Sequence, residues 1–409
     1  MHAMSRQSAF WDGPALRVME WGAYVFVLLM FAGRFGTLRE LGLYIPALLW
    51  LLRAVIRRTP SFAWRTPLFA VLVLFCISGV LSSLQSPDMV SSLAALKREH
   101  LKLLILYAVI ATVFADKDAL SRFGRVFAVA ALVYLAVGSY RIGEDLTAQG
   151  QIDYMQVRYY ATVYLYLLPP LFVQALDSAS RLRPLWAAGC VGIVSAMVLI
   201  SVRGVWLSLA GAAALWVFAA RDRLRGIFSF RSLAVFVLVT VLLVLLALVL
   251  FPSQFSLIRG HTFESLQMSL RLDTWDIFLA LSFQRPLLGH GLDDQAMSRH
   301  YHEAFSKKRA AAPAILNPTT PHNQFIKILY QQGLLGLLLY LVLLALGLKT
   351  LYRAFRKSPL DRASLVPLAF ASVILAEYVM HCFFEDRSLI PLAVLIGVAG
   401  ACLSRGERS

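Results

Sequence analysis

Apolar segments about 20 residues long recur along the whole chain and constrain its fold more than any other feature. An α-helix needs about 20 predominantly apolar residues to cross the hydrocarbon core of a bilayer. The sequence predicts an all-α integral membrane protein with about twelve transmembrane helices. They are expected at 18–34, 40–56, 66–84, 99–115, 124–140, 159–176, 185–201, 203–220, 232–251, 325–348, 365–384 and 388–404.

The composition excludes a soluble globular protein. Hydrophobic residues make up 59% of the 409 residues and charged residues only 15%, whereas soluble domains are about half apolar and about a quarter charged. No cleavable signal peptide is evident, so we expect the first apolar segment to remain as an anchor. The four cysteines fall in different apolar segments, which favours neither a metal site nor a disulfide.

The net charge of +16 reflects membrane topology rather than binding of nucleic acid. If the N-terminus lies in the cytoplasm, every cytoplasmic loop carries a cluster of arginine and lysine, as the positive-inside rule requires. Both termini are then cytoplasmic. The clusters lie at 53–65, 117–125, 181–183, 221–231 and 349–362.

One long polar segment, 252–321, interrupts the series of apolar segments and lies outside the cytoplasm by the same alternation. Helical spacing from Ser269 to Phe283, ended by Pro286, predicts a small helical cap on the outer face. The chain then divides into transmembrane helices 1–9 (residues 1–251), an outer cap (252–321), and a histidine-bearing helix with transmembrane helices 10–12 (322–409). A shorter outer loop is expected at 141–158.

The apolar run from Pro184 to Ala220 must fold back on itself. A single helix of that length would measure about 55 Å against a hydrocarbon core of about 30 Å. The polar break at Ser201–Gly204 predicts a tight outer hairpin, with Arg203 at the start of the eighth span. Span counting therefore places Arg203 and His322 on the same membrane face.

His322 is the strongest candidate for chemistry. Thr320 is expected to cap a helix, with Pro321 at its first position and helix continuing from His322 to Gln332. A helix N-terminus favours a neutral imidazole, which can accept a proton, and also suits a phosphate oxygen. The alternative is a histidine that merely anchors the helix at the membrane interface.

Basic residues gather on the outer face, against the usual bias. Arginine binds phosphate through two parallel hydrogen bonds, so this group fits a lipid-linked diphosphate. For Lys97, Arg98 and Arg158, contact with phospholipid head groups is the favoured interpretation. The residues concerned are Lys97, Arg98, Arg158, Arg203 and Arg271.

Other polar groups carry weaker signals. His300 and His302 have a metal-like spacing without an obvious third ligand, and no metal site is predicted. Asp293–Asp294 is best explained as a solvated loop. Glu377 and His381 lie one helical turn apart. They could relay protons, or each could serve as the polar partner of the other within the bundle.

These residues resemble the motifs of the O-antigen ligase family (WaaL-type). One family pattern begins with His followed by Asn, Ser or Gln. Gly comes after nine further residues, and Gly, Thr or Tyr after two more. His322, Asn323, Gly333 and Gly336 are similar to this pattern. The pattern Arg-x3-Leu is similar to Arg203–Leu207. A third likeness, to an outer loop of the superfamily, comprises Arg271 with Trp275 and the segment Arg285–Gly291.

The resemblance implies a glycosyltransferase-C-like fold and a polyprenyl-diphosphate-dependent glycosyltransferase in lipopolysaccharide biosynthesis. The donor would be undecaprenyl-diphosphate-linked O-antigen and the acceptor lipid A–core oligosaccharide, joined without cofactor or metal at the periplasmic face of a Gram-negative inner membrane. The implied catalytic residues are His322, Arg203 and Arg271. The residues predicted to bind substrate are Asn323, Arg98, Lys97, Arg158, Trp275, Gly333 and Gly336.

Alternatives remain at this stage. An O-antigen polymerase or a protein O-oligosaccharyltransferase would use the same donor, although the Arg-x10-Gly repeats typical of polymerases are not found. His322 could accept the acceptor proton or bind the diphosphate directly. A transporter with a histidine relay is disfavoured because no inverted repeat is evident.

Overall fold

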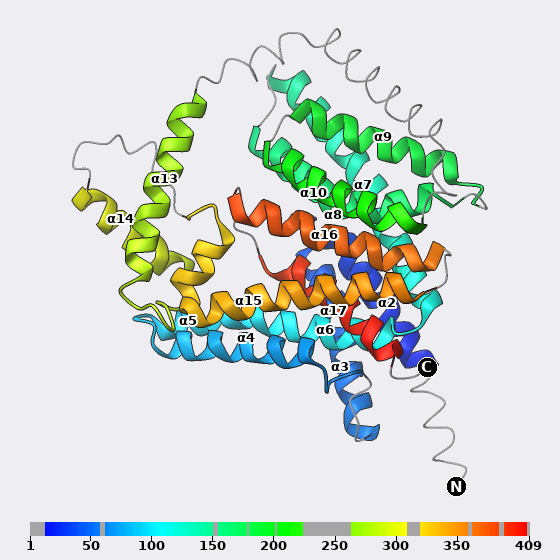
Figure 1. Ribbon diagram of the computed structural model, residues 1–409, viewed down its shortest axis with the longest axis horizontal. Coiled ribbons are helices and arrows are strands. Elements are labelled where there is room, and N and C mark those ends of the chain that lie inside the picture. Colours follow the sequence, from blue (N-terminus) through cyan, green and yellow to red (C-terminus); the bar gives the residue numbers. More distant parts are fainter. Residues whose placement is uncertain are drawn as a thin grey trace.

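The protein is a bundle of α-helices in the computed structural model (Figure 1), which describes residues 13–57, 62–149, 154–177, 180–200, 203–223, 263–308, 320–358, 362–383 and 388–406. The helices are α2 (Pro14–Leu29), α3 (Gly36–Arg57), α4 (Pro67–Leu84), α5 (Met89–Leu96), the π-helical turn η1 (Lys97–Leu101), α6 (Lys102–Val113), α7 (Lys117–Gln149), α8 (Tyr154–Ala175), α9 (Arg183–Ile200), α10 (Arg203–Arg223), α13 (Phe263–Ser282), α14 (Asp294–Lys308), α15 (Gln324–Lys357), α16 (Arg362–Phe383) and α17 (Ile390–Gly406).

Long apolar helices are consistent with the predicted membrane protein. Four of the described helices are long and apolar enough to cross a bilayer: Pro67–Leu84, Lys117–Asp145, Gln324–Lys357 and Ala363–Met380. Each predicted segment overlaps a helix except 232–251, which lies outside the described residues. The predicted twelve spans and the outer position of the cap stay predictions.

The segment predicted as a span at 99–115 is helical, with the π-helical turn η1 followed directly by α6, and its crossing of the bilayer stays a prediction. One local prediction was wrong. The outer loop expected at 141–158 is mostly helix, since α7 runs to Gln149 and α8 begins at Tyr154. Arg141 and Glu144, three residues apart, form an ion pair of 3.0 Å that is compatible with helix.

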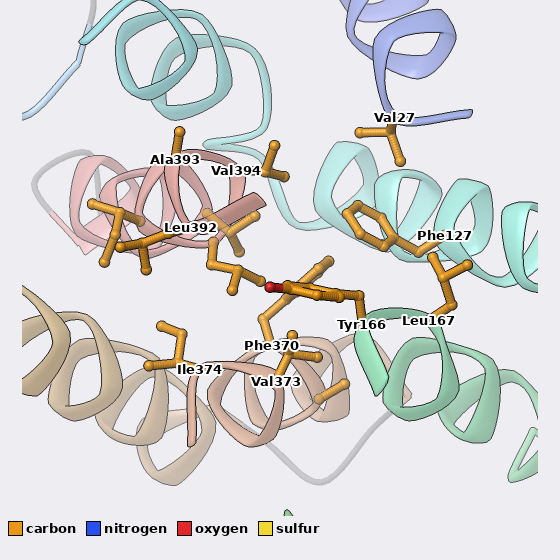
Figure 2. Packing of buried hydrophobic residues seen from close by; sticks show 14 of the residues in the cluster. Val27, Phe127, Tyr166, Leu167, Phe370, Val373, Ile374, Leu392, Ala393 and Val394 are labelled. Carbon is orange, nitrogen blue, oxygen red and sulfur yellow. The ribbon is translucent and has the colours of Figure 1, made fainter. Parts of the chain in front are cut away.

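The core lies around the C-terminal helices α16 and α17, which are buried among the others. Figure 2 shows Tyr166 of α8 surrounded by Phe370 and Val373 of α16, Leu392 of α17 and Phe127 of α7. The hydroxyl of Tyr166 donates a 2.7 Å hydrogen bond to the Glu377 carboxylate, so Glu377 is part of the bundle's internal polar network.

The predicted helical cap contains α13 and α14, which lie at the end of the bundle where α15 begins (Figure 1). α13 confirms the helix expected from Ser269 to Phe283. A second hydrophobic cluster joins the cap to α15, with the Phe278 ring stacked on Tyr301 at 5.1 Å and edge-on to Tyr330 at 5.7 Å. Packing therefore ties the cap to the first turns of α15.

Candidate functional site

The histidine motif lies on a broken helix. α15 was expected to be continuous, but Gly333 interrupts it with φ 66° and ψ −168°. Glycine alone adopts this backbone region readily. A Cβ atom on Gly333 would lie 2.3 Å from the carbonyl carbon and oxygen of Leu287. The conformation and the close approach both explain why the motif has glycine at this position.

The segment Arg285–Gly291 fills the break. The N–H groups of His290 and Gly291 donate to the carbonyls of Tyr330 and Gln331 at 2.9 and 3.1 Å. On the other side of the break, Leu334 and Leu335 donate to the carbonyls of Pro286 and Leu287 at 2.7 and 3.3 Å. The loop thus supplies the hydrogen-bond partners that the backbone groups at the break would find within a continuous helix. Within an apolar bundle these groups need such partners, because no water is available to them.

Serine side chains fix this loop to the rest of the bundle. The N–H of Gly291 donates to Ser82 Oγ at 3.0 Å, and that of Leu292 donates to Ser92 Oγ at 2.7 Å. Ser82 also donates to the carbonyl of Gln331. Two of the sequence motifs, the loop and the histidine helix, therefore form one structural unit with α4 and α5.

His322 precedes α15 rather than lying within it, so the predicted Thr320 cap was wrong. Asn323 caps the helix, its side-chain oxygen accepting from the N–H groups of Phe325 and Ile326 at 3.0 and 3.2 Å. Asn323 is a stronger cap than threonine and takes the cap position with an extended backbone. His322 has φ 48°, an uncommon value for a residue other than glycine and one often associated with functional sites.

His322 lines a cavity of about 370 Å³ between the start of α15 and the segment from α5 to η1. This volume lies within the range of small-molecule sites. Arg98, one of the predicted binding residues, lines the same cavity. The other lining residues are Ala95, Glu99, His100, Leu292, Asp294, Thr320, Gln324, Lys327, Ile328, Gln331, Gln332, Ser388 and Leu389.

Charged groups along the cavity are held in place by ion pairs and hydrogen bonds. Lys327 forms a 3.0 Å ion pair with Asp294, whose same oxygen accepts from Gln331 Nε2 at 3.0 Å. Glu99 accepts from Ser388 Oγ at 2.9 Å and from the N–H of Leu389 at 2.8 Å, which ties η1 to the start of α17. The cavity is therefore polar, with both signs of charge on its walls.

Sequence reasoning missed Lys327, Gln331, Gln332 and His100 as cavity residues. Lys327 and the glutamines do recur at helical spacing after His322, and this was the available signal. His100 stands beside the predicted pair Lys97 and Arg98, but only the fold shows that it meets Gln332.

The predicted site residues are only partly brought together. His322 and Arg98 share the cavity, whereas Asn323 caps α15 and Lys97 is exposed on η1 outside the cavity lining. Gly336 is buried, with a Cβ position 2.2 Å from Gln332 Cβ. Arg203 is the first residue of α10, Arg271 belongs to α13 and Arg158 to α8. The side chains of these three arginines lie outside what the structure describes.

Trp275 contacts the motif through its ring nitrogen. Its Nε1–H donates to the carbonyl of Pro321 at 2.8 Å. The indole therefore holds the peptide next to His322.

The histidines of the cap are engaged in packing. His300 Nδ1 lies 2.8 Å from the Tyr330 hydroxyl, and His290 stacks on the same ring at 4.7 Å. Burial lowers the pKa of His290, with His300 and Arg285 acting in the same direction and a bond to the Leu281 carbonyl opposing them. Within the described part of the chain, no group of three or more His, Cys, Asp or Glu could hold a metal ion.

Comparison with known protein families gives a match over part of the chain. No curated protein matched the chain. The family model described as O-Antigen ligase (Wzy_C) matches residues 188–341, which include α10, the cap, the loop at the helix break and His322. The chain thus carries an O-antigen ligase family domain over residues 188–341, as its motifs had indicated.

Proposed function

We propose that the protein is an O-antigen ligase, which transfers a finished O-antigen glycan from undecaprenyl diphosphate to the lipid A–core oligosaccharide. The observation that carries the proposal is the cavity shared by His322 and Arg98, because His322 lies within the segment that matches the ligase family. The site would face the periplasm of the inner membrane, where no nucleotide sugar is present and a pre-activated lipid donor is needed.

In the proposed reaction, an acceptor sugar hydroxyl attacks the anomeric carbon of the donor. The new carbon–oxygen bond forms as the bond to the diphosphate breaks, and the diphosphate leaves with the electron pair. His322 takes the hydroxyl proton, a role that typically accelerates a reaction about 10²–10⁴-fold. A direct displacement of this kind inverts the anomeric centre, and no metal takes part.

Arginines would stabilise the leaving diphosphate. Arg98 lines the cavity, and we propose that Arg203 and Arg271 reach the same ligand from α10 and α13. Charge placed where it develops in the transition state is usually the largest catalytic contribution. Arginine suits this role because its planar fork can bind two phosphate oxygens at once.

A reconstitution of the purified protein tests the proposal. Undecaprenyl-diphosphate-linked glycan is the donor and rough lipopolysaccharide the acceptor, with a chelator present and the products separated on a gel. A lipopolysaccharide band shifted by the glycan would support a ligase. A lengthened lipid-linked ladder with unchanged lipopolysaccharide would identify a polymerase and contradict the proposal. NMR of the new linkage tests inversion, which a retained configuration would rule out.

A further inference from the structure

Glu99 contributes a carboxylate to the wall of the cavity, and the proposed reaction does not use it. It belongs to the π-helical turn η1, between Arg98 and the buried His100. Turns of this kind interrupt α-helices frequently at functional sites. One carboxylate oxygen, Oε2, accepts from Ser388 Oγ at 2.9 Å and from the N–H of Leu389 at 2.8 Å. Two donors immediately before α17 therefore hold the carboxylate in one orientation.

The second oxygen of Glu99, Oε1, is accessible and has no partner within the protein. Among the residues that the structure describes, it forms no hydrogen bond, and Glu99 forms no ion pair with them. The side chain is partly exposed, and Oε1 is not one of the buried polar atoms that lack a partner, so it keeps contact with open space. Because Glu99 lines the cavity, the carboxylate offers a ligand one hydrogen-bond acceptor of fixed orientation.

Charge distinguishes Glu99 from the other carboxylate along the cavity. Asp294 accepts from Lys327 and from Gln331 at 3.0 Å, so its charge is balanced within the protein. Glu99 has no cation of this kind among the described residues. A carboxylate whose charge is not balanced repels a diphosphate. Glu99 therefore suits a neutral group of the substrates rather than the phosphates of the donor.

A sugar hydroxyl is the neutral group that fits this oxygen. A hydroxyl donates a hydrogen bond and an ionised carboxylate only accepts one. Hydrogen bonds to an ionised acceptor are also stronger than those between neutral groups. The turn η1 can therefore serve two ligands, because consecutive residues of a helical turn do not face each other. Arg98 would contact the leaving diphosphate, and Glu99 a hydroxyl of the sugar that attacks beside it.

We propose that Glu99 binds a hydroxyl group of the accepting sugar through Oε1 and orients the acceptor in the cavity. The contacts to Ser388 and Leu389 hold the carboxylate ready for this ligand, so little freedom is lost on binding. Proton transfer stays with His322, and Glu99 forms no covalent bond. The inference rests on the proposed function for the identity of the acceptor, whereas binding of that acceptor is measured without turnover.

Glu99→Gln separates acceptor binding from the contact with α17. The N–H of Leu389 can only donate, so the amide oxygen of the glutamine faces it and the NH₂ group takes the position of Oε1. That group donates instead of accepting, and the negative charge is lost. Glu144→Gln, at an exposed position of α7, is the matched control. Ser388→Ala is a second variant, which removes one of the two donors that hold the carboxylate.

Equilibrium binding is measured in detergent with two probes, rough lipopolysaccharide and undecaprenyl-diphosphate-linked glycan. Glu99→Gln should raise the Kd for rough lipopolysaccharide about tenfold or more, the size of one hydrogen bond to a charged group. Ser388→Ala should raise it by a smaller factor, roughly 2- to 5-fold, and Glu144→Gln should leave it unchanged. The Kd for the lipid-linked glycan should stay constant or fall in Glu99→Gln, because a carboxylate that repels the diphosphate is removed.

Thermal unfolding in detergent shows which variants are folded. An unchanged Kd for rough lipopolysaccharide in folded Glu99→Gln protein would overturn the proposal, as would an unchanged Kd in Ser388→Ala if Glu99→Gln does not fold. A loss of affinity confined to the lipid-linked glycan, or no binding of rough lipopolysaccharide by the wild-type protein, would also overturn it. Binding of rough lipopolysaccharide that depends on Glu99, with no ligation by the wild-type protein, would contradict the proposed function and leave the contact standing.

Discussion

The indole N–H of Trp275 donates a 2.8 Å hydrogen bond to the carbonyl of Pro321, the residue immediately before His322. Trp275 belongs to α13, so a cap helix holds the peptide that carries the motif histidine. Two of the motifs noticed in the sequence are thereby linked by a single contact. Trp275 is a positioning residue, since its contact is with the backbone.

Replacing Trp275 by phenylalanine removes this hydrogen bond while keeping an aromatic ring against the cap. We expect kcat to fall roughly 3- to 10-fold, as for the loss of one hydrogen bond that positions a catalytic group, with little change in donor affinity. Steady-state turnover of the reconstituted protein measures this effect. Trp21→Phe, at an exposed position of α2, serves as the control. Equal losses in the two variants would contradict a positioning role.

Gly333→Ala should destabilise the protein strongly. The backbone strain alone costs about 1–3 kcal/mol, and the added Cβ would lie 2.3 Å from the Leu287 carbonyl group. Thermal unfolding in detergent is the measurement. Gly143→Ala is the matched control, because a Cβ there would meet nothing within 4 Å. A Gly333→Ala protein as stable as the control would mean that the break in α15 is not required.

The sequence predicted the larger features because they depend on hydrophobicity and charge alone. The length of the apolar segments indicated a membrane protein. The cap helix was indicated by the spacing of Leu272, Trp275, Phe278 and Leu279. The predicted start of the histidine helix was wrong because two nearby polar residues, Thr320 and Asn323, could both act as caps, and only tertiary contacts decide between them.

The break at Gly333 could not be predicted from local pattern. A glycine within a helical pattern is compatible with a continuous helix at a cost of about 1 kcal/mol. The break is stable only because the distant segment 286–291 supplies the missing hydrogen-bond partners. The cavity depends on the same long-range assembly, since His100 and Gln332 are 232 residues apart in sequence.

Arg203→Lys should reduce activity nearly as much as Arg203→Ala. Lysine keeps the positive charge but lacks the planar fork that binds two phosphate oxygens. The kcat and the KM for the lipid-linked donor are measured for both variants, with Arg221→Lys at the other end of α10 as the control. Full activity of the lysine variant would contradict bidentate binding of the diphosphate.

His290 should make stability depend on pH. Burial lowers its pKa in the folded protein below the ordinary value of 6.5, so the unfolded chain binds a proton more readily. Its contribution to stability is complete above pH 6.5 and is lost as the pH falls below that value. His290→Gln can keep the hydrogen bond to the Leu281 carbonyl without titrating. Its unfolding temperature should vary less than that of the wild-type protein below pH 6.5, and parallel curves would contradict this.

The measurement that tests the central claim most directly compares wild-type protein with His322→Asn. Asparagine tolerates the positive φ of this position, so the variant removes the imidazole without adding much strain. Both kcat and the equilibrium Kd for the lipid-linked donor are measured. A fall in kcat of about 100-fold or more with an unchanged donor Kd is the result expected of a general base. A weakened donor Kd would assign His322 to diphosphate binding, and a kcat within a few-fold of wild type would contradict a catalytic role for His322.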